Sequence, residues 1–349
     1  MRSLPLAGRG TSLNPASRFE TLAVDREPWT ALDDPAPRTR FYRDRSRSVL
    51  VTNDSPDVGP SVGINPYRGC EHGCVYCYAR PNHEYLGFSA GLDFETHIVI
   101  KEDAPALLRE ALSRRAWRPR TLMLSGVTDP YQPAERRLRI TRGCLEVLAE
   151  ARNPVALVTK NHAVTRDLDL LRELARHHAV AVTLSVTTLR RDLQRVMEPR
   201  TSTPLRRLDA VRRLAEAGVP VGVNLAPVIP GLTDEEVPAI LRAAREAGAG
   251  WAGYILLRLP HGVKALFADW LADHFPERRE RVLNRLREAY GGRLYDAAFG
   301  VRGQGTGAYA DQIRALFRSA ARRLGLEAPP TLSTAAFRRP APPGQFTLW

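Results

Sequence analysis

The chain carries GCEHGCVYCY at residues 69–78, a stretch with three of its four cysteines, Cys70, Cys74 and Cys77. Secreted disulfide scaffolds spread their cysteines along the chain, so this clustering indicates a metal site in a reducing compartment. A [4Fe–4S] cluster needs thiolates close in sequence, because one loop must wrap three of its corners. Three protein thiolates leave the fourth iron open to a further ligand. The spacing therefore favours an iron–sulfur cluster with an open coordination site.

A structural zinc site is the alternative interpretation of these cysteines, and it needs a fourth ligand. His72 is close, but it lies between two of the cysteines and is poorly placed to close a tetrahedron. Cys144 is distant in sequence and falls inside a predicted helix, where we expect it to be a buried small hydrophobic residue. A non-enzymatic zinc-binding module stays open as one interpretation of function.

Around the cysteine loop, short β-rich runs alternate with amphipathic helical patterns. The predicted strands are 62–65, 121–125, 155–160, 180–186, 219–225 and 254–257, with an extra strand at 94–101. The predicted helices are 104–115, 142–151, 166–177, 204–217 and 234–247. Strands that are apolar throughout and alternate with helices indicate a parallel sheet covered by helices. Six such units predict an α/β fold, a partial (β/α)6 TIM-like barrel with its chemistry at the carboxyl ends of the strands.

This core is predicted to span residues 61–260, between segments of different character. Residues 1–60 form a basic, poorly regular N-terminal extension. Residues 261–325 form a helical region with helices at 264–274, 277–290 and 308–324. Residues 326–349 are rich in proline and short of periodicity, which predicts a flexible tail.

The charge balance suits a polyanionic partner. The chain has 51 basic and 38 acidic residues, a net charge of +13, and nucleic acid is the first candidate for such a surplus. The run 38–47 interleaves arginines with Phe41 and Tyr42, a composition that can contact phosphates and stack on bases. The alternative is that the arginines form solvated faces and that this run is a solvated arm.

No part of the sequence predicts a membrane span or a signal peptide. No window approaches the ~20 continuous apolar residues that a spanning helix needs. The first ten residues have neither an apolar core nor a cleavage-like end. We expect a cytoplasmic protein without a membrane partner.

The spacing of the cysteines, with Tyr76 just before the last one, resembles the signature of the radical S-adenosylmethionine (SAM) superfamily. Longer matches resemble its spore photoproduct lyase-related, DNA repair photolyase-like branch, and within it an uncharacterised bacterial family. They are NDSPD at 53–57, NPYRGCEHGC at 65–74, VYCYAR at 75–80, GLDFE at 91–95, GVTDPYQP at 126–133, MEPR at 197–200 and APVIPG at 226–231. The resemblance covers about residues 8–320.

This resemblance implies a single [4Fe–4S] cluster on Cys70, Cys74 and Cys77. In such proteins the cluster donates one electron to SAM, which yields a 5′-deoxyadenosyl radical that abstracts a substrate hydrogen atom. A flavodoxin- or ferredoxin-type partner would supply the electron. No cysteine follows Cys144, so a second, auxiliary cluster is not expected.

The resemblance also implies where SAM binds. Ser125, Gly126 and Thr128 follow the second barrel strand, in the place of the superfamily's Gly-Gly-Glu motif. Small residues there let the backbone approach the amino group of SAM. Because this chain has no Glu in the motif, Ser125, Thr128 or Asp129 would supply the acceptor.

The other implied SAM contacts lie in the cysteine loop and at the ends of later strands. Lys160 and Ser185, on the third and fourth strands, are expected to bind the SAM carboxylate, as in spore photoproduct lyase. The remaining expected contacts are Tyr76 in the cysteine loop, Glu198 and Arg200 for the ribose or carboxylate, and Asn224 beside the adenine. Ordinary strand-end chemistry is the alternative for Lys160 and Ser185.

The substrate stays open between two classes. The branch resemblance and the basic charge favour a nucleic acid, and a peptide or protein is the alternative. Spore photoproduct lyase returns a hydrogen atom through a cysteine near its active site, but residues 122–132 of this chain contain none. This departure weakens the case for thymine-dimer repair itself.

The chain ends in Gln345-Phe346-Thr347-Leu348-Trp349 after its proline-rich segment. This ending resembles the short peptide by which bacterial repair proteins bind the DNA sliding clamp, with Leu348 and Trp349 in an apolar groove. The alternative is a tail that folds back to bury Trp349 on its own domain.

Overall fold

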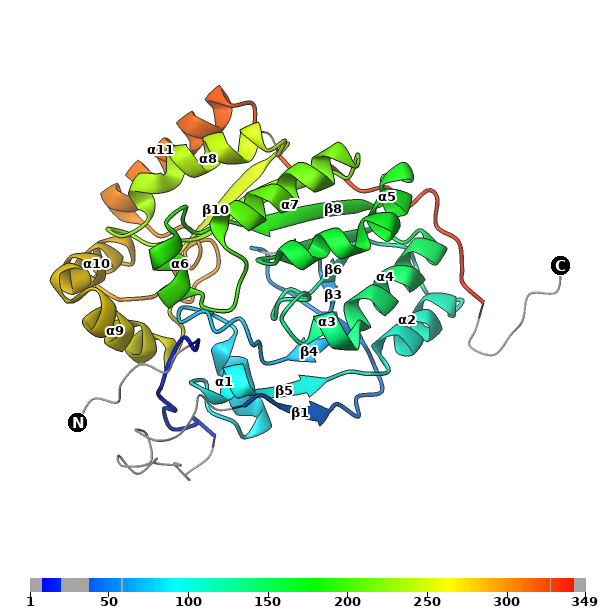
Figure 1. The fold of residues 1–349 in the computed structure, drawn as a ribbon, viewed down its shortest axis with the longest axis horizontal. Coiled ribbons are helices and arrows are strands. Elements are labelled where there is room, and N and C mark those ends of the chain that lie inside the picture. The colour runs from blue at the N-terminus through cyan, green and yellow to red at the C-terminus, as the bar shows by residue number, and fades with distance from the viewer. Residues whose placement is uncertain (1–7, 20–37, 58, 327, 342–349) are drawn as a thin grey trace.

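A computed structural model of the chain describes residues 8–19, 38–57, 59–326 and 328–341. Its main feature is an open seven-stranded sheet in the order β10-β9-β8-β7-β6-β3-β2 (Figure 1). The strands are β2 (Leu50–Thr52), β3 (Val62–Ile64), β6 (Leu122–Leu124), β7 (Val155–Thr159), β8 (Val180–Ser185), β9 (Val221–Val228) and β10 (Ala252–Leu256). All neighbouring pairs are parallel except β2 with β3.

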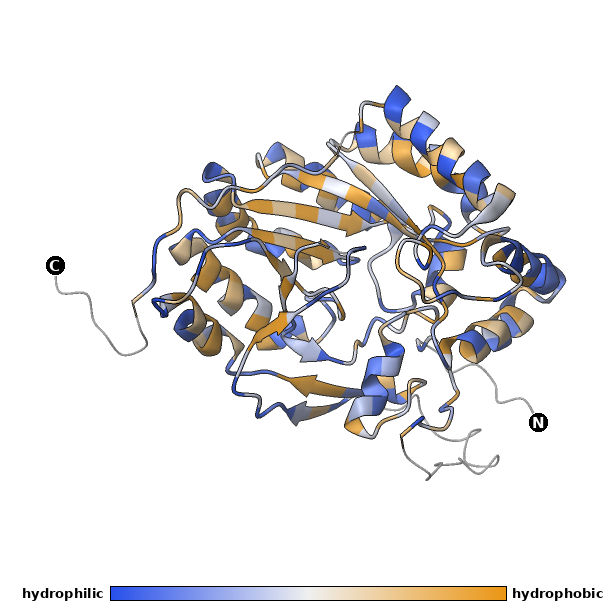
Figure 2. Cartoon of the chain, turned by 180° about the vertical axis from the view of Figure 1, so that it is seen from behind, coloured by the Kyte–Doolittle hydropathy of each residue, from blue (hydrophilic) through white to orange (hydrophobic). Residues whose placement is uncertain are grey.

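Helices cover the outer face of this sheet. The main ones are α2 (Ala104–Ser113), α4 (Ile140–Ala151), α5 (Leu168–Arg176), α7 (Pro204–Glu216) and α8 (Val237–Glu246). Each is amphipathic; in α5, for example, Leu171 and Leu174 are buried because they lie on one face of the helix. Figure 2 shows the hydrophobic strands of the sheet between helices whose outer faces are hydrophilic.

These observations confirm an α/β fold of the partial-barrel kind. Six of the described strands, β3 and β6 to β10, are parallel and joined through helices. The sheet is not closed in the described part of the chain, because β10 pairs with β9 alone. The far edge of β10 is covered by α11 (Gly307–Arg323), where Phe317 packs on Tyr254 with ring centroids 4.7 Å apart. The predicted C-terminal helices are present as α9 (Val263–His274), α10 (Pro276–Ala289) and α11.

The N-terminal extension is more regular than its sequence predicted. β1 (Arg40–Arg43) pairs in parallel with β5 (His97–Ile100), which also pairs with β4 (Tyr67–Arg68) in a second, three-stranded sheet. All four residues of β1 are exposed, so the strand has no apolar alternation and is held by backbone pairing at a sheet edge. The predicted extra strand at 94–101 is also shorter, because α1 (Asp93–Thr96) precedes β5.

Residues 328–341, which belong to the proline-rich tail predicted to be flexible, lie against the domain. Ser333 N–H donates to His178 O at 2.9 Å, and Arg338 N–H donates to Ala151 O at 2.8 Å. The Arg339 guanidinium bonds the last carbonyls of α2, and partly buried Phe337 packs against the core. The segment is therefore bound across the amino ends of β7 and β8. The predicted clamp-binding residues 345–349 lie outside the described residues.

Among the described helices, none is long and apolar enough to cross a lipid bilayer.

Candidate active site

A cavity of about 400 Å³ opens at the carboxyl ends of the parallel strands. One wall is the cysteine loop, and the opposite walls are residues at or just after the carboxyl ends of β6, β7, β8, β9 and β10. Of the residues expected to hold the cluster or SAM, the cavity is lined by Cys70, Cys74, Tyr76, Cys77, Ser125, Gly126, Thr128, Lys160, Ser185 and Asn224. The topology thus brings together segments as far apart in sequence as Cys70 and Arg258.

The three cysteines of the loop all face this cavity as free thiols. Cys70 and Cys74 are buried and Cys77 is partly buried, and burial raises the pKa of each thiol above its ordinary value. No group of three His, Cys, Asp or Glu side chains among the described residues is arranged to hold a single metal ion. Three thiols on one loop, at the wall of a cavity, fit the donor set of an iron–sulfur cluster with an open corner.

The loop is fixed by buried polar side chains behind it. The Gln132 side chain accepts from Glu71 N–H at 2.9 Å and donates to Gly69 O at 3.2 Å. Arg80, fully buried, donates to Cys74 O at 3.0 Å and pairs with Glu95 at 2.6 Å. Gly69 has φ +78°, and a Cβ there would come within 3.0 Å of backbone oxygens of β5 and α1, so glycine is required.

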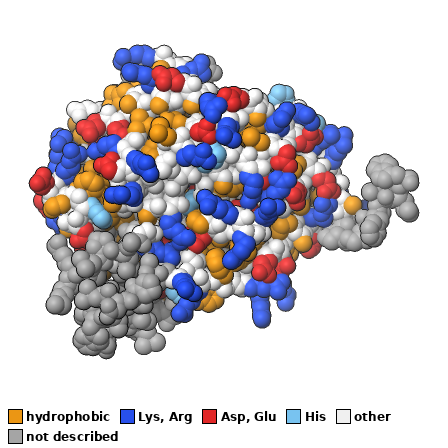
Figure 3. All heavy atoms as spheres, viewed as in Figure 1, with side chains coloured by type: hydrophobic (Ala, Val, Ile, Leu, Met, Phe, Trp, Pro, Cys, Tyr) orange, Lys and Arg blue, Asp and Glu red, His pale blue; other side chains and the backbone are white. Residues whose placement is uncertain are grey.

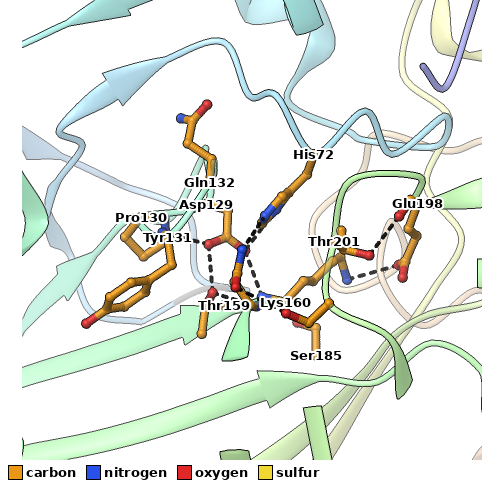
Figure 4. Close-up of polar contacts among 12 residues, drawn as sticks. His72, Asp129, Pro130, Tyr131, Gln132, Thr159, Lys160, Ser185, Glu198 and Thr201 are labelled. Carbon is orange, nitrogen blue, oxygen red and sulfur yellow. Dashed lines mark hydrogen bonds and ion pairs between the residues drawn. The ribbon is translucent and has the colours of Figure 1, made fainter. Parts of the chain in front are cut away.

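Asp129 organises the polar groups between the cysteine loop and β7 (Figure 4). It accepts from Thr159 Oγ1 and Lys160 N–H at 2.7 Å, and its carboxylate lies 3.4 Å from His72 Nδ1. Burial alone would raise the pKa of Asp129, but His72 and these hydrogen bonds lower it below its ordinary value. Asp129 is therefore ionised, and its carboxylate oxygens already accept hydrogen bonds from groups of the protein. Tyr131, two residues further along the chain, is buried and donates to Asp167.

A second network lies behind the cavity around Glu198, which is drawn with its partner Lys160 in Figure 4. Glu198 is fully buried, and it accepts hydrogen bonds from Tyr76 Oη, Thr187 Oγ1 and the Arg207 guanidinium. Burial would raise the pKa of Glu198, but Arg207 and Lys160 lower it to about 2. Lys160 Nζ lies 3.5 Å from Glu198 and donates to Ala226 O at 2.9 Å. Glu198 therefore fixes Tyr76 and Lys160, which do face the cavity.

Ser125 has the most unusual conformation at the site. Its φ of +65° is left-handed, which a residue with a side chain seldom adopts. Its hydroxyl is buried and has no hydrogen-bond partner in the described part of the protein. By contrast, Thr128 donates its hydroxyl to Tyr67 O at 2.9 Å, and Gly126 O accepts from Tyr78. Of Ser125, Thr128 and Asp129, only Ser125 has a side chain without any hydrogen-bond partner among the described residues.

Asn224 resembles Ser125 in this respect, because its Oδ1 is buried without a partner among the described residues. Ser185 is buried beside it on β8 and also lines the cavity. Two of the expected SAM contacts do not reach the cavity wall. Both follow α6 (Arg191–Met197): Glu198 lies behind the wall, paired with Arg207, and Arg200 pairs with Glu71 at 3.2 Å.

The sequence did not single out several residues that shape the site. Arg207 on α7 is only 1% exposed although its position looks like any helical arginine, so no local signal marked it. Arg80 follows the cysteine loop directly, and that proximity was the available signal. Arg258 lines the cavity mouth two residues after β10, just beyond the strand predicted at 254–257. Cys144 is buried within α4, as predicted.

Comparisons with known proteins agree with this geometry. Residues 64–244, half of the chain, match the family model of the radical SAM superfamily. An uncharacterised protein of Mycobacterium tuberculosis is 39% identical over 229 residues, which are 65% of this chain and 66% of that relative, slightly less than two thirds of its length. An uncharacterised protein of Methanocaldococcus jannaschii is 29% identical over 184 residues, 53% of this chain and 66% of the relative.

Among solved structures, spore photoproduct lyase complexed with a dinucleoside spore photoproduct has a similar fold. The TM-score is 0.55, the identity is 16%, and the match covers 81% of this chain and 79% of that one. At this identity the likeness concerns the fold, and it agrees with the partial barrel described above. The chain therefore belongs to the radical SAM superfamily.

Proposed function

We propose that this chain is an enzyme that reductively cleaves SAM at one [4Fe–4S] cluster bound by Cys70, Cys74 and Cys77, and that it acts on a nucleic acid. With cluster and SAM bound, the site supplies a 5′-deoxyadenosyl radical for hydrogen abstraction. The observation that carries the proposal is the shared cavity: three free thiols on one wall face Ser125, Lys160 and Asn224 on the others.

The chain's own residues would bind and orient SAM within this cavity. Lys160 offers a cation for the carboxylate, and its position is set by Glu198 and Ala226 O. Ser125 and Asn224 offer buried oxygens without protein donors, as the SAM amino group or adenine requires. The apolar strand ends around them, such as Leu256 and Leu257, exclude water.

Anaerobic reconstitution with iron and sulfide tests the proposal. We expect iron binding with broad visible absorbance, and 5′-deoxyadenosine formation when reduced protein is mixed with SAM. Replacement of Cys74 by Ala removes one of three thiolates, so we expect loss of nearly all bound iron and all SAM cleavage.

Cys144→Ala is the matched control, because Cys144 is buried in α4 and does not line the cavity. We expect this variant to bind iron as the wild type does. Equal iron loss in both variants would contradict the assignment. Colourless protein containing zinc would instead support the zinc-binding module.

The partners follow from the same proposal. We propose a flavodoxin- or ferredoxin-type electron donor, and recruitment to the DNA sliding clamp through residues 345–349. A tail peptide that shows no clamp binding by fluorescence anisotropy at high micromolar concentration would overturn the second of these. Radical modification of a peptide or protein is the alternative function, and it predicts SAM cleavage that is stimulated by peptides and unaffected by nucleic acids.

A further inference from the structure

The mouth of the cavity carries an arginine held in a fixed plane. Arg258 follows β10, lines the cavity, and places its guanidinium carbon 4.7 Å from the centroid of the Tyr78 ring. The Tyr78 hydroxyl donates to Gly126 O, which holds the ring against the end of β6. This cation–π contact restrains the guanidinium over the ring and leaves N–H groups at its edge to bind a ligand.

Arg258 differs from the other basic residues near the cavity because its donors are not used. Its Nε is buried without an acceptor, and no ion pair to Arg258 exists among the described residues. Lys160, by comparison, is bonded to Ala226 O and lies beside Glu198. Asp57, the nearby acid at the mouth, is occupied by Arg302 Nε at 2.7 Å and Gly300 N–H at 2.8 Å. A planar cation with free donors suits an anionic oxygen group.

Exposed aromatic rings accompany this cation. Tyr78 is 42% exposed and Phe299 is 55% exposed. Phe299 stacks with Arg302 at 4.6 Å, and Arg302 in turn holds Asp57 of the cavity lining. Aromatic rings beside arginines are the arrangement that binds single-stranded nucleic acid, through base stacking and phosphate contacts.

The face of the molecule shown in Figure 3 offers a less specific arrangement. On the face shown in Figure 3, basic side chains are spread over many elements and mingle with acidic ones. Arg43 in β1, part of the run predicted to bind phosphates, pairs with Asp103 at 3.1 Å. The free donors of Arg258 therefore distinguish the mouth from such paired surface arginines.

We propose that Arg258 binds a backbone phosphate of a nucleic-acid strand whose target nucleotide enters the cavity, with Tyr78 and Phe299 as stacking faces. This inference rests on the proposed function and names the residue that selects its substrate class. A peptide carboxylate or the carboxylate of SAM would use the same donors, and the experiment separates these ligands from a phosphate.

The test uses the full-length, reconstituted protein with SAM and a fluorescent, short, mixed-sequence single-stranded DNA, made with phosphodiester or with neutral methylphosphonate links. For the phosphodiester strand, we expect Arg258→Gln to weaken binding about 10-fold and to reduce the salt dependence by about one phosphate contact. Arg258→Lys keeps the charge without the planar fork, so we expect an intermediate loss. Arg172→Gln, an exposed arginine on α5, controls for net charge and should bind nearly as the wild type does.

The neutral strand completes a double-mutant cycle, in which Arg258→Gln should cost little affinity. Equal losses for both strands would overturn the phosphate contact. A parallel loss of SAM affinity in Arg258→Gln would assign the residue to the SAM carboxylate and overturn the proposal. Wild-type protein that cleaves SAM but binds only acidic peptides would overturn the nucleic-acid substrate alone, whereas absence of SAM cleavage would overturn the proposed function itself.

Discussion

Two sets of polar residues surround the same cavity and differ in how far the protein satisfies them. The closed network consists of Tyr76, Lys160, Glu198 and Arg207, whose polar groups are bonded to one another or to the backbone. The open positions are Ser125, Asn224 and Arg258, each with a buried polar atom that lacks a partner in the described protein.

This difference indicates that the two sets of residues have different roles. A buried polar group without a partner costs about 1–3 kcal/mol, so it persists where a ligand completes it. A satisfied network holds its members in place before any ligand arrives, which lowers the cost of binding. Mutations of Glu198 and Arg207 should therefore change stability, and mutations at the open positions should change ligand affinity.

The largest expected effect comes from breaking the closed network. Glu198→Gln leaves the guanidinium of Arg207, 1% exposed, without its counter-charge. Removing one partner of a buried ion pair costs about 3–5 kcal/mol. We expect a loss of this size in the free energy of unfolding, measured by urea denaturation.

Two variants sharpen this test. Glu216→Gln breaks a pair with Arg212 on the surface of α7 and should change stability little. Glu198→Gln combined with Arg207→Met removes both charges and should recover part of the loss. Wild-type stability in the Glu198→Gln single variant would show that the network is not what holds this wall.

A smaller effect concerns His83, which is also buried with an unpartnered nitrogen, Nε2, but does not line the cavity. It stacks on Phe88 at 5.2 Å and meets the edge of Phe94 at 5.6 Å. Burial lowers the pKa of His83 to about 4 from its ordinary 6.5. Between these pH values the unfolded chain binds a proton that the folded chain does not, so acidification favours unfolding.

We therefore expect His83 to contribute a loss of at most about 3 kcal/mol as the pH falls from 6.5 to 4. The measurement is the free energy of unfolding of wild type and His83→Phe across this interval. The phenylalanine keeps the ring contacts and cannot be protonated, so its profile should be flatter. The same pH dependence in both proteins would mean that His83 is not held neutral. His83 is thus an unpartnered buried group that no ligand in the cavity reaches, and it affects stability. The unpartnered groups in the cavity should affect ligand affinity instead.

The sequence predicted the fold and the three thiols of the cysteine loop. It did not predict which polar groups around the cavity are bonded within the protein and which are open. The six parallel strands had continuous apolar runs bounded by polar residues, a strong local signal. The cysteines were marked by spacing within one loop. β1 was missed because its four side chains are exposed, and the packed segment 328–341 because backbone bonds to His178 and Ala151 leave no pattern in the sequence.

Site residues were predicted by strand-end position, which does not distinguish a side chain in the cavity from one behind it. Glu198 follows β8 as expected, but Arg207, nine residues further along the chain, draws it inward. Ser125 and Thr128 lie in one short motif, yet only Thr128 has a backbone acceptor. Such differences depend on neighbours that are distant in sequence, so they became visible only in the folded chain.

The smallest expected effect is at Ser125, where conformation and ligand binding can be separated. Ser125→Ala removes the free hydroxyl and keeps the left-handed backbone, while Ser125→Gly removes the hydroxyl and relieves the strain. If the hydroxyl accepts from SAM, both variants should bind SAM about 10-fold more weakly, as the loss of one hydrogen bond to a charged group predicts. Isothermal titration with SAM under anaerobic conditions measures this.

The two variants should differ in stability although they agree in affinity. Glycine adopts positive φ without a steric penalty, so Ser125→Gly should be more stable than Ser125→Ala by about 1 kcal/mol. Ser113→Ala, at the end of α2 and away from the cavity lining, is the control for loss of a serine hydroxyl and should leave SAM affinity unchanged. Weaker SAM binding by Ser125→Ala alone would show that backbone geometry, and not the free hydroxyl oxygen, matters at this position. Ser125 would then belong with the closed network.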